Sequence, residues 1–240
     1  MVLRYHISDG GPAATASLPG RRLPVPVSPA YRGEVTDDSA DAQPRVPARR
    51  GRPGYGREEV LDVAVRVFTE QGYDATSIAD LSKELGLTKS ALYHHFASKE
   101  QLLALALERA LSGLEGALER AIEEQATAAD RLRAAVRGAI EVLTSQQSYV
   151  TLLLRLRGNS PVELDALDRR RRFDQRIAGL VREAQAEGRI RDDIDAGTVA
   201  RLVFGMINSL VEWYRPGGAI DPVLLADDVL AVALDGLRPR

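Results

Sequence analysis

From Arg57 onward, apolar residues recur along the chain with the spacing of an amphipathic α-helix. In the first such segment the residues at i, i+3, i+4 and i+7 are Leu61, Ala64, Val65 and Phe68. This spacing places them on one face of a helix. Gly72 follows at the position where glycine commonly ends a helix. The pattern therefore predicts a helix that begins near Arg57 and stops before Gly72.

The same reasoning predicts further helices along the rest of the chain. Two short helices are expected at about 77–84 and 88–94, separated by Gly86, with Thr88 as the N-cap of the second. Ser98 and Gln101 form a capping-box pattern that begins a long helix reaching about residue 125. The other expected helices are at about 128–145, 148–157, 161–188, 195–214 and 222–237. No segment shows convincing strand alternation, so we expect an all-α fold of about nine helices.

The first 48 residues differ from the rest, because seven of the 12 prolines lie there and no apolar period persists. Such a composition does not support packed elements, so residues 1–48 are expected to be disordered. The expected organisation is then a basic arm at 49–56, a first helical domain at 57–97, and a larger helical domain at 98–240.

Charge and composition narrow the classes of function. The formal net charge is −2, so any binding to nucleic acid has to come from a local patch. The chain has no cysteine, which excludes disulfides, thiol nucleophiles and zinc fingers. No run of about eighteen apolar residues occurs and the N-terminus lacks the apolar core of a signal peptide, so we expect no membrane partner and a cytoplasmic location.

Two short helices joined by a glycine-containing turn are typical of a helix-turn-helix, whose second helix enters the major groove. The stretch TSIADLSKELGLTKSALYHHFASKEQLL, residues 76–103, resembles the TetR family almost position for position, and the resemblance covers about 57–107 closely. One departure is Ser82, where alanine is common in the family; serine is small enough to be tolerated. The resemblance implies that the first three helices bind DNA, the fourth links to a ligand-binding body, and the last two form a dimer interface.

The resemblance also implies roles for individual residues. Thr76 and Ser77 would hold a phosphate with hydroxyl and backbone N–H groups at a helix N-terminus. Lys99 would hold a flanking phosphate, and the alternative is a solvated charge. The residues expected to face the groove are Thr88, Lys89, Ser90, Ala91, Tyr93 and His94. Ala91 is small enough to allow close approach, and the alternative for Tyr93 is partial core packing.

The arm contains the run ARRGRPG at residues 48–54. Its Arg-Gly-Arg-Pro core resembles an AT-hook, in which Arg50 and Arg52 would lie in a narrow, electronegative minor groove. The alternative is a flexible basic linker that only screens phosphates. A short basic run does not decide between them.

Residues 205–218 resemble the C-terminal region of TetR regulators that bind acyl-coenzyme A thioesters. Such a ligand needs an apolar tunnel with arginines at its mouth, because the planar guanidinium suits phosphate. The candidate ligand residues are Arg155, Arg176, Asn208, Trp213 and Arg215. Asn208 lies in an apolar stretch and needs a partner, which could be another helix, the opposing subunit or the ligand.

Four consecutive arginines, residues 169–172, spread around a helix, so a solvated face paired with nearby carboxylates is expected; one of them remains a candidate for a ligand phosphate. An enzyme is disfavoured, because the body has no histidine and the chain has no nucleophile motif or metal-ligand spacing, and no cofactor is expected. The alternatives kept open are a ligand-independent, nucleoid-associated DNA-binding dimer and an efflux regulator that senses a lipophilic compound. From the resemblance we expect a homodimeric repressor that a small ligand releases from its operator; activation is the alternative, because the sequence does not fix the sign of regulation.

Overall fold

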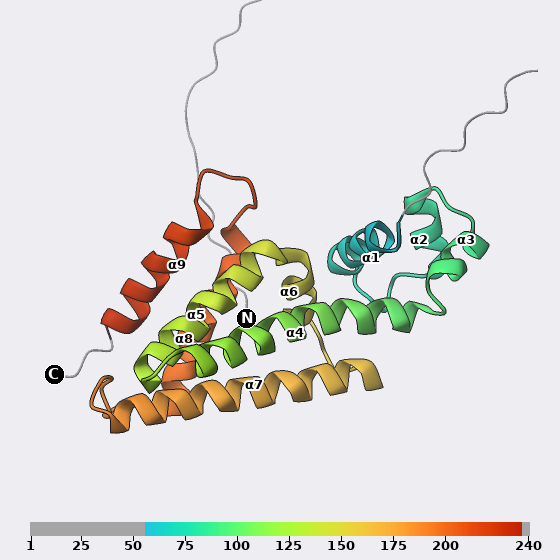
Figure 1. Cartoon of the computed structure of the whole chain (residues 1–240). Helices are drawn as coiled ribbons and strands as arrows, with labels where there is room; N and C mark the ends of the chain where they lie inside the picture. Colours follow the sequence, from blue (N-terminus) through green and yellow to red (C-terminus); the bar gives the residue numbers. More distant parts are fainter. Residues whose placement is uncertain (1–55, 237–240) are drawn as a thin grey trace, which may run out of the picture. The chain divides into compact units, whose positions relative to one another are not determined.

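The computed structural model describes residues 56–236, and these are almost entirely helical (Figure 1). The expected disordered segment 1–48, and the arm with Arg50 and Arg52, lie outside the described residues. The described elements are α1 (Arg57–Gln71), α2 (Ile78–Leu85), α3 (Lys89–His95), α4 (Lys99–Glu124), α5 (Ala128–Ser145), α6 (Gln147–Leu154), α7 (Pro161–Ala186), α8 (Ala196–Trp213), α9 (Pro222–Leu230) and a π-helical turn, η1 (Ala231–Asp235). The prediction of an all-α fold with about nine helices is confirmed.

Most helices begin at a side-chain cap, which explains why their starts could be read from the sequence. The caps whose side-chain oxygen accepts a backbone N–H are Ser77, Thr88, Ser98, Thr127, Ser160, Asp195 and Asp221. At α4 the capping box is shifted by one residue. Ser98 accepts the N–H of Gln101 at 3.1 Å, but the Gln101 side chain accepts the N–H of Ala97 at 2.7 Å.

The end of α6 differs from the prediction, because the helix stops at Leu154 instead of near residue 157. The cause is the carboxylate of Glu163, which is buried at the start of α7. One of its oxygens accepts the backbone N–H groups of Arg157, Gly158 and Asn159 at 2.8–3.1 Å. These donors are thereby held in a loop. The α-helical geometry expected to residue 237 likewise ends at Leu230, where the π-helical turn η1 takes over.

The core of the body lies between α4, α5, α7 and α8, and α4 runs beside α7 in Figure 1. Helices α4 and α5 approach closely where Gly138 of α5 faces Ala117 of α4. A Cβ added at Gly138 would lie 2.7 Å from the Ala117 Cβ, closer than two carbon atoms can pack. The crossing therefore leaves no room for a side chain larger than that of glycine at position 138.

Replacing Gly138 by alanine is expected to lower the free energy of unfolding. Overpacking a core costs about 1–3 kcal/mol, more than the roughly 0.5–1 kcal/mol that alanine gains over glycine in a helix. Gly179, in α7, is the matched control, because a Cβ there meets nothing within 4 Å. The free energy of unfolding, measured in urea at equal protein concentration, should be higher for Gly179→Ala than for the wild type and lower for Gly138→Ala. Equal gains for both variants would show that the α4–α5 contact has room.

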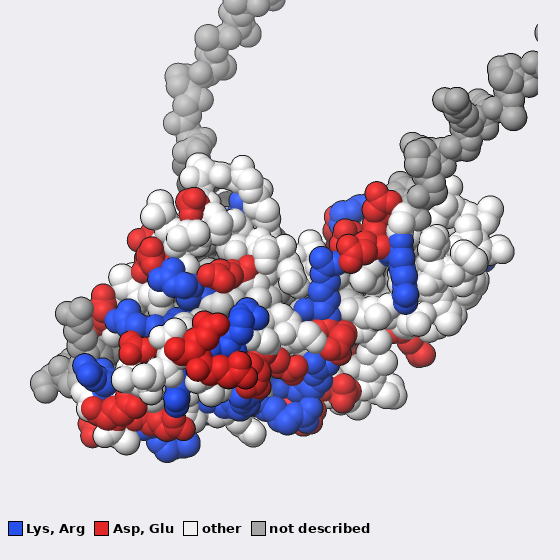
Figure 2. All heavy atoms as spheres, viewed as in Figure 1, with Lys and Arg blue, Asp and Glu red and all other residues white. Residues whose placement is uncertain are grey.

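Helices α4 and α7 are joined by an ionic contact. Arg169 donates to Glu108 at 2.5 Å and to Glu115 at 2.7 Å, and its side chain is only 18 % exposed. Hydrogen bonds from Arg169 lower the pKa of Glu108, so this carboxylate stays charged. Figure 2 shows acidic and basic side chains interspersed over the body. Of the four consecutive arginines, Arg171 and Arg172 pair with Asp168, as expected for a solvated face.

Within residues 56–236 no helix is long and apolar enough to cross a membrane.

Candidate functional site

Helices α2 and α3 form a helix-turn-helix with an apolar inner face. The residues that bury their side chains there are Leu81, Leu85, Leu92 and Phe96. Gly86 makes the turn, and its φ of +63° is a left-handed conformation that favours glycine. Its N–H returns to the carbonyls at the end of α2, and Thr88 then caps α3 by accepting the N–H of Ala91 at 3.1 Å. The local sequence thus sets the angle between the two helices.

The outer face of α3 presents a compact set of polar side chains. Thr88, Lys89, Ser90, Tyr93 and His94 are all exposed, whereas Ala91 is half-buried. Tyr93 is 51 % exposed, so the alternative of core packing does not describe its side chain. The structure therefore brings the predicted groove-facing residues together on one side of the second helix of the motif.

Thr76 requires a correction. Its side chain is 2 % exposed, and its hydroxyl donates to the carbonyl of Gly72 at 2.8 Å. Its backbone N–H lies 3.2 Å from the carbonyl oxygen of Tyr73, so both of its donors are used inside the domain. Thr76 closes the α1–α2 loop and cannot hold a phosphate as expected.

Ser77 is exposed, but its donors are also engaged. Its N–H and hydroxyl both bond to the carboxylate of Asp80, at 2.9 Å and 2.6 Å. These hydrogen bonds lower the pKa of Asp80, which keeps a negative charge in the first turn of α2. A phosphate contact by Ser77 stays a prediction that would require these bonds to rearrange.

Lys99 has a structural contact that the sequence did not reveal. Its ammonium donates to the carbonyls of Tyr73 and Thr76, both at 2.9 Å, and lies 4.1 Å from the centre of the Tyr73 ring. Lys99 therefore ties the start of α4 to the α1–α2 loop. The ammonium has three N–H donors, so the predicted phosphate contact of Lys99 stays a prediction for the third.

The helix-turn-helix domain by itself is not basic. Residues 57–97 contain four basic and seven acidic residues, a net charge of −3 with histidine neutral. Figure 2 agrees, because the surface over α2 and α3 is mostly uncharged in this view. DNA affinity depends strongly on cationic contacts with phosphates. The domain therefore needs positive charge from elsewhere, and the arm before it contains the arginines that could supply it.

In the body, two adjacent chambers lie between α7 and α8. We call the larger one, of about 320 Å³, the outer cleft; it is lined by Arg170, Asp174, Gln175, Ile177, Ala178, Gly197, Ala200, Arg201, Phe204, Gly205 and Asn208. The smaller one, of about 30 Å³, is the inner hollow. Its apolar lining comes from α4, α5, α6, α7 and α8 and includes Leu114, Leu143, Val150, Leu153, Phe173 and Ile207.

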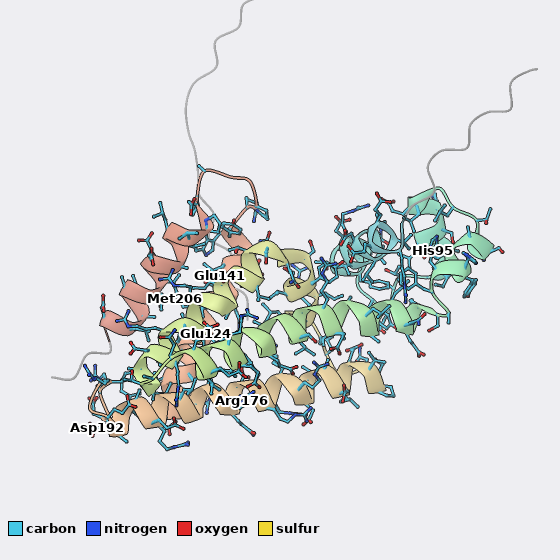
Figure 3. All side chains as sticks on the ribbon, viewed as in Figure 1. His95, Glu124, Glu141, Arg176, Asp192 and Met206 are labelled. Carbon is cyan, nitrogen blue, oxygen red and sulfur yellow. The ribbon has the colours of Figure 1, made fainter. Side chains whose placement is uncertain are left out.

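The five predicted ligand residues do not come together, and only Asn208 lines the chambers. Arg176, labelled in Figure 3, bonds to Glu119 of α4 at 2.5 Å and 3.0 Å. Arg215 donates to the carbonyls of Glu212 and Tyr214 beside it. Trp213, at the end of α8, is 49 % exposed. Arg176 and Arg215 are held by other partners, and neither they nor Trp213 line the chambers, so these side chains do not meet at one site.

Arg155, the remaining predicted ligand residue, lies at the junction between α1 and α6. Its guanidinium donates to the carbonyl of Thr69 at 2.8 Å, and it lines a separate cleft of about 640 Å³ between these helices. Asn159 crosses the same junction and donates to the carboxylate of Asp74 at 2.8 Å.

Tyr149 of α6 makes the central contact of this junction. Its hydroxyl donates to the carboxylate of Asp62 in α1. Arg109 of α4 lies 4.7 Å from the centre of the Tyr149 ring and 3.8 Å from Glu58 of α1. Burial, followed by the bond to Asp62, raises the pKa of the Tyr149 hydroxyl, so it stays protonated and keeps donating. Two other residues of α6, Val150 and Leu153, line the inner hollow.

The sequence analysis missed two residues that line both chambers, Asp174 and Phe204; it considered the third, Arg170, only as one of four arginines that could reach a ligand phosphate. Their spacing contained a usable signal. Arg170 and Asp174 stand four apart on α7, as do Phe204 and Asn208 on α8, and residues four apart share a helix face. The run of four arginines concealed this pair, because only one of the four turns toward α8.

Two family models match the sequence. Residues 60–106 match the one described as bacterial regulatory proteins, tetR family, and residues 125–237 match a tetracyclin repressor-like C-terminal domain. Among curated proteins, the HTH-type transcriptional repressor KstR2 of Mycolicibacterium smegmatis is 25 % identical over 194 residues, covering 80 % of this chain and 95 % of the relative.

Solved structures show the same fold. SCO3833, a member of the TetR transcriptional regulator family from Streptomyces coelicolor, is 49 % identical with a TM-score of 0.69, covering 75 % of this chain and 90 % of its own. AibR, solved in complex with isovaleryl coenzyme A and operator DNA, is 24 % identical with a TM-score of 0.63, covering 74 % of this chain and 97 % of its own.

Proposed function

The chain belongs to the TetR family of bacterial transcriptional regulators, and we propose that it is a homodimeric repressor released from its operator by an amphiphilic effector. The observation that carries the proposal is the pairing of two surfaces in one compact unit. The exposed polar face of α3 is suited to contacts in a DNA groove, and the two chambers between α7 and α8 offer space for a small molecule. Because its operator lies on the chromosome, we place the protein in the cytoplasm.

The DNA-binding part of the proposal covers residues 49–97. Lys89, Ser90, Tyr93 and His94 are the side chains proposed to reach base edges or phosphates, because they are exposed together on α3. Arg50 and Arg52 of the arm are proposed to supply phosphate or minor-groove contacts, since the domain at 57–97 has a net charge of −3. The body at 98–240 is proposed to bind the effector and the second subunit.

Dimerisation is proposed through α8 and α9. These helices expose large apolar side chains, and exposed apolar patches commonly mark an interface with another protein chain. Those more than half exposed are Leu202, Val223 and Leu224, at 60–64 %, and Val232 of the adjoining η1 is 66 % exposed. A twofold dimer would also present two α3 helices to successive major grooves, about 34–36 Å apart. A self-complementary four-helix interface accounts for both requirements.

An acyl-coenzyme A thioester is the proposed effector class. The chambers offer an apolar interior and a polar mouth that contains Arg170 and Arg201, as a ligand with an apolar tail and an anionic head requires. Among the relatives, a regulator from Bacillus subtilis is named for fatty acid metabolism, and AibR binds isovaleryl coenzyme A. The proposed mechanism is a population shift, in which the ligand favours a conformation of the body whose α3 helices no longer fit the operator.

The test is operator binding by the full chain, measured by fluorescence anisotropy against the DNA upstream of its own gene. Two chains per operator and release by a micromolar thioester, with no release by free coenzyme A, are expected. Release by lipophilic drugs alone would favour an efflux regulator. Tight binding that no small molecule disturbs would favour a ligand-independent dimer and would contradict the proposed effector.

A further inference from the structure

The outer cleft and the inner hollow share four lining residues, Arg170, Asp174, Phe204 and Asn208. We call these four residues the partition. They come from two i, i+4 pairs, one on α7 and one on α8, so they lie side by side across the interface of these helices. Phe204 packs edge-on against Phe173, with ring centroids 5.4 Å apart. Phe173 is buried, whereas Phe204 is half-buried and borders the outer cleft.

We propose that the partition sets the length of the apolar tail that the effector can have, with the Phe204 ring as its movable part. The ligand class is an anionic amphiphile with a short, linear acyl tail. The tail occupies the inner hollow, the carbonyl group lies at the partition, and the anionic head lies in the outer cleft. This inference rests on the proposed function, because it concerns the same effector site.

The outer side of the partition suits a polar, anionic head. Arg170 and Arg201 line the cleft, and neither is held in a salt bridge with another described residue. The side-chain amide of Asn208 makes no hydrogen bond with a described residue, so it is available to a carbonyl group. Burial raises the pKa of Asp174, and the nearby Arg170 opposes that shift. The partition thus presents polar groups that are half-buried or exposed, between the outer cleft and the apolar lining of the inner hollow.

The inner side limits the tail. The inner hollow measures about 30 Å³, which is roughly the space that two water molecules occupy. Side chains from five helices surround it, and most of them are buried, so it cannot widen without repacking the core. The Phe204 ring is the exception, because it can turn outward into the outer cleft. Each methylene that enters apolar space is expected to raise affinity about fourfold, until the hollow is full.

The experiment measures dissociation constants by isothermal titration for two series of probes, acyl-coenzyme A thioesters and free carboxylates, each with two, four, six, eight and twelve carbons. The variants are Phe204→Ala, the more conservative Phe204→Leu, and Gln175→Ala as a matched control. Gln175 lines the outer cleft but not the partition. Operator binding without ligand is measured for every variant, to show that each one folds.

In the wild type the tightest binding is expected at two or four carbons, because a hollow of about two water volumes holds only about two carbons beyond the carbonyl. No further gain is expected at six, eight or twelve carbons. Phe204→Ala should move this optimum to eight carbons or more and tighten binding of the eight-carbon probe at least tenfold. Phe204→Leu should fall between the two, and Gln175→Ala should leave the optimum unchanged. If only the carboxylates show this pattern, the partition stands and the thioester class under the proposed function fails.

Three results would overturn the inference. They are a wild-type affinity that keeps rising to twelve carbons, a Phe204→Ala profile equal to that of the wild type, and the absence of binding in both series. If operator binding is still observed alongside them, the proposal that the protein is a DNA-binding regulator stands.

Discussion

Replacing Tyr93 by alanine is expected to lower operator affinity by roughly two orders of magnitude or more. Tyr93 is exposed on the outer face of α3, so the loss should not disturb the core. One side-chain contact in a groove is worth about 1–3 kcal/mol. In a dimer each substitution acts twice, so the loss is about 2–6 kcal/mol for the complex. Lys89→Ala should give a loss of the same order, with a smaller dependence on salt than the wild type.

The matched control is Lys83→Ala. Lys83 is exposed in the last turn of α2, within the same motif but off the second helix. The Lys83→Ala substitution removes one positive charge from the domain without changing the outer face of α3. It should therefore lower operator affinity less than tenfold. Anisotropy titrations at several salt concentrations separate these effects. An equal loss in Lys83→Ala and Lys89→Ala would mean that general charge, rather than the α3 face, determines binding.

Replacing Tyr149 by phenylalanine is expected to uncouple the effector site from the DNA-binding domain. The tyrosine hydroxyl donates to Asp62 of α1, while Val150 and Leu153 of the same helix line the inner hollow. A hydrogen bond to a charged group contributes about 1.5–3 kcal/mol, and coupling between two sites in a protein is typically 1–3 kcal/mol. Losing this bond should therefore reduce the effect of a saturating ligand on operator affinity about tenfold. Ligand binding and operator binding without ligand should change only a few-fold.

The measurement is the operator dissociation constant with and without saturating ligand, using the probe that binds the wild type best. Asp62→Asn keeps an acceptor for the hydroxyl and should give a smaller effect. Tyr214→Phe removes a hydroxyl in the body away from α1 and should change nothing. A Tyr149→Phe protein that is released as readily as the wild type would show that the signal takes another route to α1.

The fold and the DNA-binding surface could be predicted from the sequence because both depend on local rules. Helix starts followed from caps such as Ser77, Thr88 and Ser98, whose side chains bond only two or three residues away. The outer face of α3 was implied by the family resemblance, and helical periodicity agrees with it, since residues that share a face are three or four apart. Contacts at longer range escaped this reasoning, and they account for the corrections at Thr76 and at the end of α6, and for the structural contacts of Lys99.

The effector site was the part that only the tertiary structure could decide. A position on a helix does not say which neighbouring helix it meets, so Arg155, Arg176 and Arg215 were chosen for their chemistry alone. The packing of α4, α7 and α8 directed Arg176 to Glu119 and turned Arg170 toward the chambers. The sequence by itself therefore determined the helices, their capped starts and the face of α3. Which side chains surround a cavity depends on the order in which distant helices pack, and this was decided by the tertiary structure.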